Sequence, residues 1–412
     1  MSPVFPFDIF ELVIEAVGEN EDTNLLKELA LVSHSFHQIC SKHLFATVEL
    51  HDADPKRHIA SSKQGFVKLI ESRPDVFKYI RKLTYETKCY FYSPISPSSS
   101  IYSDDELLSP ILPNFLRTIS GLNCLKIDAS ELDWQELDSS LTSALLHLMH
   151  LPTVNHIDLS SITNFPLSAF NPSVNLYRLD IFRVYPIIED GELEDSSLLF
   201  VQSGMMPKLR EFHISGSHWM TTNLLLAKGQ DGQPAFNFMD LIGLSIPFTR
   251  FERGEWNIRY ALQNAKLIEK LHISLFRDGT LVDLHDVLFL RARTLKVLDL
   301  TVFLTDTWNS FFLGGLCEEL EALAGHNMLE ALFLKILVDG YETEYFIGSI
   351  IQKVEGVLVK PGWSALRKVS FKLEVEPDDR AKLSVVLRSF PDKYLSHLSK
   401  LVSVTFNCSV SS

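Results

Sequence analysis

The sequence is poor in the features that mark nucleic-acid-binding, disulfide-bonded and membrane-spanning proteins. It has 52 Asp and Glu against 38 Lys and Arg, and no block of Lys or Arg could neutralise a row of phosphates. Its five cysteines lie far apart without a C-x-x-C pair, which argues against a disulfide framework and a zinc ribbon. No stretch approaches the roughly 20 apolar residues that cross a bilayer. We therefore expect a reducing compartment, no nucleic-acid partner and no membrane.

The amino terminus also lacks the basic and long apolar segments of a secretory signal. Together with the cysteine pattern, this predicts a cytoplasmic or nuclear location. With 46% hydrophobic and 22% charged residues, the chain has enough apolar material for a sizeable core. At 412 residues, that material would form either several globular domains or one elongated repeat array.

Common catalytic and phosphate-binding motifs are missing as well. The sequence has no G-x-x-x-x-G-K-[ST], G-x-G-x-x-G, G-x-S-x-G or H-E-x-x-H. The nearest approach to a metal cluster is the row His34, His37, Cys40 and His43. Each step of three residues turns about 60° around a helix, so four such side chains cannot converge on one ion. We expect no enzyme, no catalytic residue, no metal and no cofactor, with an unrecognised hydrolase as a distant alternative.

The first fifty residues predict three short helices. The first ends at Gly18 and carries apolar residues along one face, at Ile9, Phe10, Val13, Ile14 and Val17. The polar run 19–23 supplies a loop and caps a second helix, and Ser33 caps a third. Three such helices present more apolar surface than they can bury among themselves, which indicates that part of it contacts a partner.

This segment resembles an F-box over residues 3–50. Phe5-Pro6-x-Asp8-Ile9 is similar to the family's Leu-Pro-x-Glu-Leu/Ile opening, and Val32-Ser33-x-x-Phe36 is similar to its Val-Ser-x-x-Trp/Phe signature. The family implies docking, mainly through apolar side chains, onto the small Skp-type adaptor of an SCF ubiquitin ligase. The adaptor-binding residues that follow from the resemblance are Phe5, Pro6, Ile9, Phe10, Val13, Ile14, Leu29, Val32, Phe36 and Ile39. The alternative is a helical cap that seals one end of a repeat array.

The rest of the chain repeats the pattern L-x-x-L-x-L, with other aliphatic residues and Phe allowed. Eleven copies begin at Ile80, Leu122, Val154, Leu176, Leu209, Leu241, Ile268, Leu295, Leu329, Leu366 and Leu401. Successive copies lie 22 to 42 residues apart, which is room for a strand, a turn and a returning helix. The helices are expected at residues 134–149, 256–266, 284–292, 311–324, 345–359 and 380–390. One strand and one helix cannot bury their own apolar faces, so the units must stack into an α/β solenoid.

This array resembles leucine-rich-repeat proteins over about residues 77–407. The resemblance implies a horseshoe of parallel strands with outer helices, and the uneven spacing predicts an irregular one. The expected organisation is an F-box at 1–50, a helical linker at 51–76 and a leucine-rich-repeat-like array at 77–412. A Ser/Pro-rich stretch at 89–113 and an acidic stretch at 189–195 predict loops, and Ser103-Asp-Asp-Glu106 is a weak match to a phosphorylation site.

Strand alternation predicts which side chains of the array face a partner. The repeated apolar positions point to the core, so the residues beside them lie on the opposite, concave face, where partners of such arrays usually bind. The predicted target-binding residues are His156, Asp158, Arg178, Asp180, Glu211, His213, Lys270, His272 and Asp299, with Lys335, Lys368 and Lys372 further along. A solvated sheet face that binds nothing is an equally open interpretation.

Taken together, these patterns predict a non-enzymatic substrate-recognition subunit of an SCF-type ubiquitin ligase. Its F-box would dock on the adaptor, and its array would bind a target protein that the sequence does not identify. The alternative is a scaffold or interaction protein that uses the repeat array without any ligase. Copurification with the adaptor separates the two.

Overall fold

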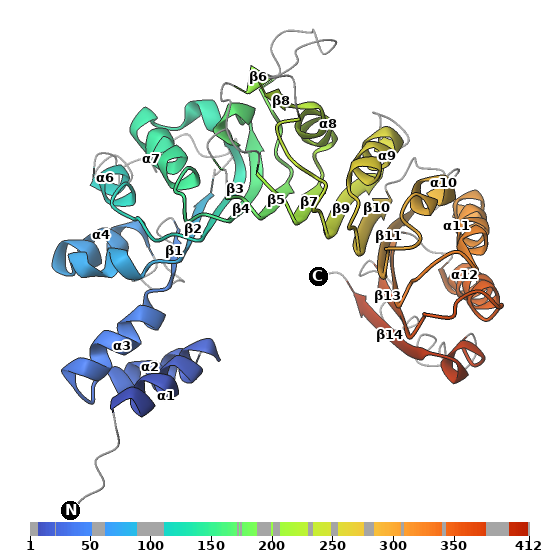
Figure 1. Cartoon of the computed structure of the whole chain (residues 1–412), viewed down its shortest axis with the longest axis horizontal. Helices are drawn as coiled ribbons and strands as arrows, with labels where there is room; N and C mark the ends of the chain where they lie inside the picture. The colour runs from blue at the N-terminus through green and yellow to red at the C-terminus, as the bar shows by residue number, and fades with distance from the viewer. Residues whose placement is uncertain are drawn as a thin grey trace, which may run out of the picture. The chain divides into compact units, whose positions relative to one another are not determined.

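The computed structural model describes most of the chain as helices, parallel strands and short connections (Figure 1). The described residues are 7–20, 22–51, 62–88, 111–170, 173, 175–187, 199–200, 207–229, 234–248, 254–275, 284–305, 309–339, 343–375 and 395–410. The chain divides into two compact units, the first made of residues 1–196 and 200–207 and the second of residues 197–199 and 208–412. Both units are α/β, and their strands alternate with helices along the sequence.

Three short helices open the first unit: α1 (Phe7–Glu19), α2 (Thr23–Ala30) and α3 (His34–Leu44). Both predicted caps are confirmed. The Asp22 carboxylate accepts a hydrogen bond from the Leu25 N–H at 3.1 Å, and the Ser33 hydroxyl accepts one from the Phe36 N–H at 3.3 Å. The helices close around a small core of Ile14, Leu26, Ile39 and Cys40.

Gly18 does not end α1 as predicted, because the helix continues through it to Glu19. A Cβ at this position would collide with the imidazole ring of His43 on α3. The glycine therefore allows two helices to approach closely, and it does not act as a helix stop. The sequence pattern could not separate these two uses of glycine.

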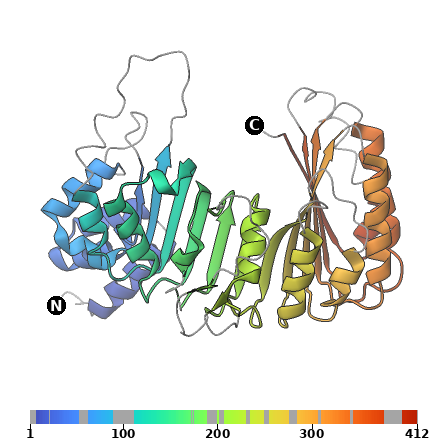
Figure 2. The same cartoon turned by 90° about the horizontal axis from the view of Figure 1, so that it is seen from above.

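The first unit builds its sheet on β1 (Thr47–Leu50), β2 (Lys82–Lys88), β3 (Cys124–Asp133), β4 (His156–Thr163) and β5 (Arg178–Phe182). These strands pair in parallel in the order β1-β2-β3-β4-β5. The connecting helices are α4 (Lys63–Ser72), η2 (Pro74–Tyr79), α6 (Ile111–Leu116), η3 (Trp134–Glu136), α7 (Ser139–Met149) and η4 (Leu167–Phe170). Helices α4, α6 and α7 lie on one side of this sheet (Figures 1 and 2).

The second unit continues the same alternation. Its sheet runs β7 (Glu211–Ser215), β9 (Gly243–Phe248), β10 (Lys270–Leu275), β11 (Val297–Thr305), β12 (Ala331–Asp339), β13 (Lys368–Val375) and β14 (Ser403–Val410), all in parallel. Its helices are α8 (His218–Leu226), α9 (Gly254–Asn264), α10 (Leu284–Phe289), α11 (Asn309–Leu323), α12 (Thr343–Leu358) and η6 (Leu398–Lys400). The short strands β6 (Leu199–Phe200) and β8 (Lys228–Gly229) lie outside this sheet.

The repeated apolar pattern is confirmed as the organising feature of both sheets. In every one of the eleven copies a strand begins two residues after the first apolar position. The fourth positions pair across neighbouring strands in the first unit, where Leu83 faces Leu125 and Leu125 faces Ile157, and all three side chains are fully buried. Parallel strands buried on a helix-covered face stack their aliphatic side chains in this way.

The predicted helices are confirmed for 256–266, 284–292, 311–324 and 345–359, with ends shifted by a few residues, and the predicted stretch 134–149 is divided into the short turn η3 and the helix α7. Residues 380–390 lie outside the described residues, as do 89–110 and the acidic stretch 189–195. The predicted loop at 89–113 needs one correction, because helix α6 already begins at Ile111 and buries Leu112 and Pro113. Among the described helices, none is long and apolar enough to span a bilayer.

Candidate functional site

Helices α1 to α3 expose several large apolar side chains. Leu31 is 87% exposed, and Leu12 and Val32 are each 65% exposed. Exposed large apolar side chains in this segment are Ile9, Leu12, Val13, Leu25, Leu31 and Val32, which we call the helix patch. Scattered exposed leucines are ordinary on a protein surface, but six in 24 residues suggest a contact surface.

The predicted adaptor-binding residues fall into three groups. Ile9, Val13 and Val32 belong to the helix patch. Phe10 and Phe36 are partly buried and contact each other with their rings tilted and the ring centroids 5.3 Å apart, and Leu29 packs beside the small core. The structure buries Ile14 and Ile39 inside that core, so they support the surface and do not contact a partner directly. Phe5 and Pro6 lie outside the described residues.

Sequence reasoning missed three members of the helix patch: Leu12, Leu25 and Leu31. Leu31 stands next to Val32 in the segment that resembles the family signature, and it precedes the Ser33 cap. A residue in the turn between two helices has no helical periodicity to mark its face. Its orientation therefore became visible only with the turn geometry.

A second candidate surface is the face of the first unit's sheet that carries the polar residues. Strand β4 alternates as predicted: Ile157 and Leu159 are fully buried, while His156 and Asp158 remain partly exposed. On β5, Leu179 and Ile181 are buried in the same way and Arg178 and Asp180 are partly exposed. The register sets His156 against Arg178 and Asp158 against Asp180. The sequence thus correctly predicts the face on which these four residues lie.

These side chains form a connected polar cluster. Nε2 of His156 donates to Oδ2 of Asp180 at 2.7 Å, and Nε of Arg178 donates to the same oxygen at 2.8 Å. Burial opposes the charged imidazolium, but hydrogen bonds with Asp180 and Cys124 outweigh it and raise the pKa of His156 to about 9. At neutral pH the cluster therefore holds two cations, His156 and Arg178, on one carboxylate.

Three further members of this cluster come from β3 and were not predicted as site residues: Cys124, Lys126 and Asp128. Nζ of Lys126 lies 3.0 Å from Asp128 and 3.8 Å from Asp158. Burial raises the pKa of Asp158, although the charge of Lys126 opposes this shift. The missed signal was the repeat copy at 122–127, whose alternation places Lys126 on the same face as Asp158. The first patch comprises Cys124, Lys126, Asp128, His156, Asp158, Arg178 and Asp180.

The second unit carries its own polar row. His272 on β10 lies between two hydroxyls, with Nδ1 2.8 Å from Ser245 Oγ and Nε2 3.0 Å from Thr301 Oγ1. Burial lowers the pKa of His272, so its ring is neutral at pH 7, and burial raises the pKa of Asp299 beside it. The second patch comprises Glu211, His213, Ser245, Lys270, His272, Asp299, Thr301, Lys335, Lys372 and Glu374.

An ion-pair triad ends this row near the last strands. Glu374 on β13 accepts hydrogen bonds from Lys372 at 2.6 Å and from Lys335 on β12 at 2.9 Å. On β7, Glu211 and His213 lie 3.9 Å apart, and Lys270 is exposed. Of the nine predicted target-binding residues, four therefore belong to the first patch and five to the second, and each patch is a surface of its own unit.

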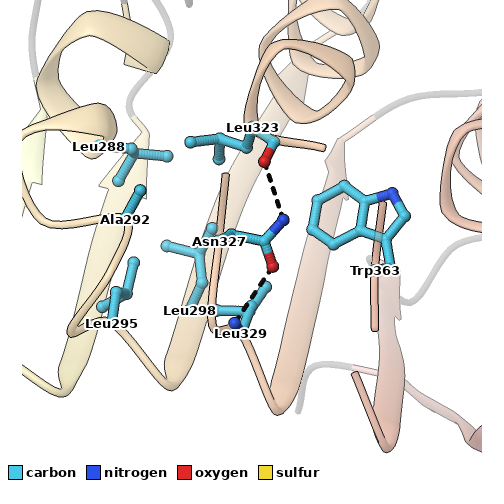
Figure 3. A pocket seen from close by; sticks show the side chains of 8 residues that line it. All are labelled: Leu288, Ala292, Leu295, Leu298, Leu323, Asn327, Leu329 and Trp363. Carbon is cyan, nitrogen blue, oxygen red and sulfur yellow. Dashed lines mark hydrogen bonds between the residues drawn. The ribbon is translucent and has the colours of Figure 1, made fainter. Parts of the chain in front are cut away.

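A small cavity in the second unit offers no ligand site. Its volume is about 10 Å³, which is room for roughly one water molecule. The polar side chain in its lining, Asn327, donates to the Leu323 carbonyl at 2.8 Å and accepts from the Leu329 N–H at 3.1 Å (Figure 3). The cavity lining consists of Leu288, Ala292, Leu295, Leu298, Leu323, Asn327, Leu329 and Trp363. We interpret it as a packing gap between α10, α11 and β11.

The histidine row of α3 is not arranged around an ion. His34 lies 3.1 Å from Gln38, His37 lies 3.1 Å from the guanidinium of Arg73, and Cys40 is fully buried. Within the part of the chain that the structure describes, no group of three or more His, Cys, Asp or Glu could hold a metal.

A scan of the sequence against models of known protein families and a search of curated proteins find no match. Function must therefore be inferred from the chain's own residues.

Proposed function

We propose that this chain is the substrate-recognition subunit of an SCF-type ubiquitin ligase, with α1 to α3 as an F-box and the strands and helices after them as leucine-rich repeats. The observation that carries the proposal is the helix patch. Its six apolar side chains are exposed on helices whose interior is already closed by Ile14, Leu26, Ile39 and Cys40. A partner with an apolar groove would remove this surface from water.

Burial of the helix patch against a partner would be energetically favourable. Burying a large aliphatic side chain contributes about 1.5 to 3 kcal/mol, so a helix patch of this size could supply a stable interface even after the cost of association. The first fifty residues also resemble an F-box at its opening and at its Val-Ser-x-x-Phe signature. In that family the partner is the Skp-type adaptor, so we assign the helix patch to this contact.

The polar patches of the two units would bind the target protein selectively. Both present ordered, mixed charges on strand faces, and such faces give specificity through charge complementarity more than through raw affinity. The first patch holds its side chains by hydrogen bonds and ion pairs within and between neighbouring strands, so little rotamer freedom remains to be lost on binding. The catalytic work of ubiquitin transfer would then be done by other subunits.

The experiment that tests this function is coexpression of the full chain with a Skp-type adaptor and the cullin scaffold. The wild-type chain is expected to copurify with both at a fixed ratio. Ile9→Asp should lose both, because it places a charge in an apolar contact. Met328→Asp is the matched control, since Met328 is a 53% exposed apolar residue of the second unit. Recovery of neither partner by the wild-type chain would favour the alternative, a leucine-rich-repeat scaffold without a ligase.

A further inference from the structure

A thiol, an imidazole and a carboxylate form a chain of contacts within the first patch. Sγ of Cys124 lies 3.3 Å from Nδ1 of His156, whose Nε2 lies 2.7 Å from Oδ2 of Asp180. All three side chains are partly exposed. A thiol beside an imidazole that a third group orients is one arrangement by which proteins activate cysteine.

The arrangement follows from strand register. Cys124 pairs with His156 across β3 and β4, and Asp180 lies on β5 two residues after the register partner of His156. Arg178 donates to the same Asp180 oxygen at 2.8 Å and so fixes the carboxylate against the ring. Because all three groups stand on rigid parallel strands, their geometry does not depend on a loop.

We propose that Cys124 is a nucleophilic thiol and a site of reversible modification by small disulfides, with His156 as the cation that stabilises its thiolate and Asp180 as the positioning residue. At neutral pH the imidazolium of His156 lies beside Sγ, so the Sγ–H proton leaves to water and Nδ1–H of His156 stabilises the resulting thiolate. The thiolate sulfur then attacks one sulfur of the disulfide, so that a new S–S bond forms as the old one breaks. The departing thiolate takes a proton from water, and a second thiol reverses the modification by the same exchange.

Electrostatics support this assignment. The hydrogen bonds with Asp180 and Cys124 outweigh burial and raise the pKa of His156 to about 9, so the ring can keep a proton beside the sulfur at neutral pH. A cation next to a cysteine favours the thiolate, which is the reactive form. The other charged groups facing the pair from β2, β3, β4 and β5 are Lys82, Glu86, Lys126, Asp128, Asp158 and Arg178.

The backbone around Cys124 favours sulfur over carbon as the atom attacked. Attack on an acyl carbon needs N–H donors that stabilise an oxyanion. The N–H groups of Asn123 and Cys124 both donate to the carbonyl of Arg81, at 2.7 and 3.0 Å. They are therefore not free to stabilise an oxyanion. Thiol–disulfide exchange needs no such donors, because the leaving sulfur carries the charge. A small disulfide thus fits this open sheet face better than an ester or amide.

The other two cysteines with described side chains provide internal controls. Cys40 is fully buried in the core of the three helices, and burial raises the pKa of its thiol. Burial likewise raises the pKa of the Cys317 thiol. Neither thiol should react at neutral pH in the folded protein. Cys124 should therefore be modified selectively among these three.

The test measures the rate at which each cysteine of the full chain is alkylated by iodoacetamide between pH 5.5 and 10, with peptide mass spectrometry as the readout. We expect Cys124 at pH 6.5 to react at least tenfold faster in wild type than in His156→Gln, and the two rates to converge near pH 10. Asp180→Asn should lie between them. Glu136→Gln changes an exposed carboxylate of the first unit that lies outside the first patch, and it should stay within twofold of wild type.

A second arm uses oxidised glutathione at pH 7. We expect one glutathione on Cys124 of the wild-type chain, its removal by a thiol reductant, and at least tenfold slower formation in His156→Gln. Melting curves confirm that each variant is folded. The proposal is overturned if wild-type Cys124 reacts no faster at pH 6.5 than a cysteine in an unstructured peptide, if His156→Gln leaves the rate unchanged, or if alkylation is fast but no mixed disulfide forms.

Discussion

His156 on β4 donates a 2.7 Å hydrogen bond to Asp180 on β5, and this bond, together with the contact to Cys124, outweighs burial and raises the pKa of the imidazole to about 9. A raised pKa contributes stability that is fully present below the unfolded value near 6.5 and is lost as the pH rises through 9. We therefore predict that the free energy of unfolding falls by about 1 to 3 kcal/mol between pH 6.5 and 9.5. Denaturant unfolding at several pH values between 6.5 and 9.5 measures this free energy.

The control for this prediction is a double-mutant cycle. Asp180→Asn should remove most of the fall in stability between pH 6.5 and 9.5 in the wild-type background. In a His156→Gln background the same change should leave the pH dependence almost unaltered. An equal effect of Asp180→Asn in both backgrounds would show that the pH dependence arises elsewhere.

The second prediction separates the inside of the three helices from their surface. Ile14 is 1% exposed, so Ile14→Ala should destabilise α1 to α3 by about 2 to 5 kcal/mol. Ile9 lies on the same helix but faces outwards, so Ile9→Ala should change stability by less than about 0.5 kcal/mol. Hydrogen exchange of the α1 to α3 amides measures both. Equal effects of the two variants would mean that the helices do not pack as described.

The third prediction concerns the triad of Glu374, Lys372 and Lys335. A hydrogen bond from Lys372, opposed by burial and assisted by Lys335, lowers the pKa of Glu374 below its usual range. Its contribution is therefore present above pH 4.5 and is lost as the pH falls through the lowered pKa. Glu374→Gln should cost about 1 kcal/mol at pH 7, and this cost should shrink as the pH falls below 4.5.

The matched control for the triad is Glu269→Gln. Glu269 also accepts from a lysine, Lys296, at 2.8 Å, but both side chains are more than 40% exposed. Exposed pairs contribute little because water screens them. Unfolding curves at pH 7 should rank Glu374→Gln as clearly less stable than Glu269→Gln, and the opposite ranking would refute the role given to Glu374.

The strands were predictable because burial enforces the pattern that specifies them. Leu83, Leu125 and Ile157 are fully buried, so each copy had to keep an aliphatic residue there. Helix α8 lacked such a signal, since Met220, Thr221, Leu224 and Leu225 are buried on several of its sides and no amphipathic stripe remains. A helix or strand that is buried on one face shows a periodic apolar pattern in the sequence. A helix that is buried on several sides shows no such pattern.

The site was less predictable than the fold. Alternation indicated that His156 and Asp180 share a face, but their contact depends on the register between strands 22 residues apart. The spacing of Cys124 from the other cysteines argues only against a disulfide framework and a zinc ribbon. Its proximity to His156 follows from pairing across a further 32 residues. Such contacts arise from stacking of repeats, and no local pattern encodes them.

The fourth prediction addresses the second patch, on the proposal that it contacts the target. Lys270 is exposed on β10, so Lys270→Glu should leave folding intact and reduce target capture severalfold, most strongly at low salt. Lys266→Glu makes the same charge change in the turn before the strand and serves as the control. Pull-downs from lysate at low and high salt compare the proteins captured by the two variants and by wild type. An unchanged set of captured proteins with Lys270→Glu would mean that this strand face is only solvated.

The most direct test of the central proposal is the affinity of the purified full chain for a Skp-type adaptor, measured by titration calorimetry. Val32→Asp should weaken binding at least 30-fold, because it places a charge in a desolvated apolar contact and costs about 2 kcal/mol or more. Leu267→Asp, which alters a 52% exposed leucine of the second unit, should stay within twofold of wild type. No measurable adaptor binding by the wild-type chain, or wild-type affinity in Val32→Asp, would contradict the assignment of α1 to α3 as an F-box.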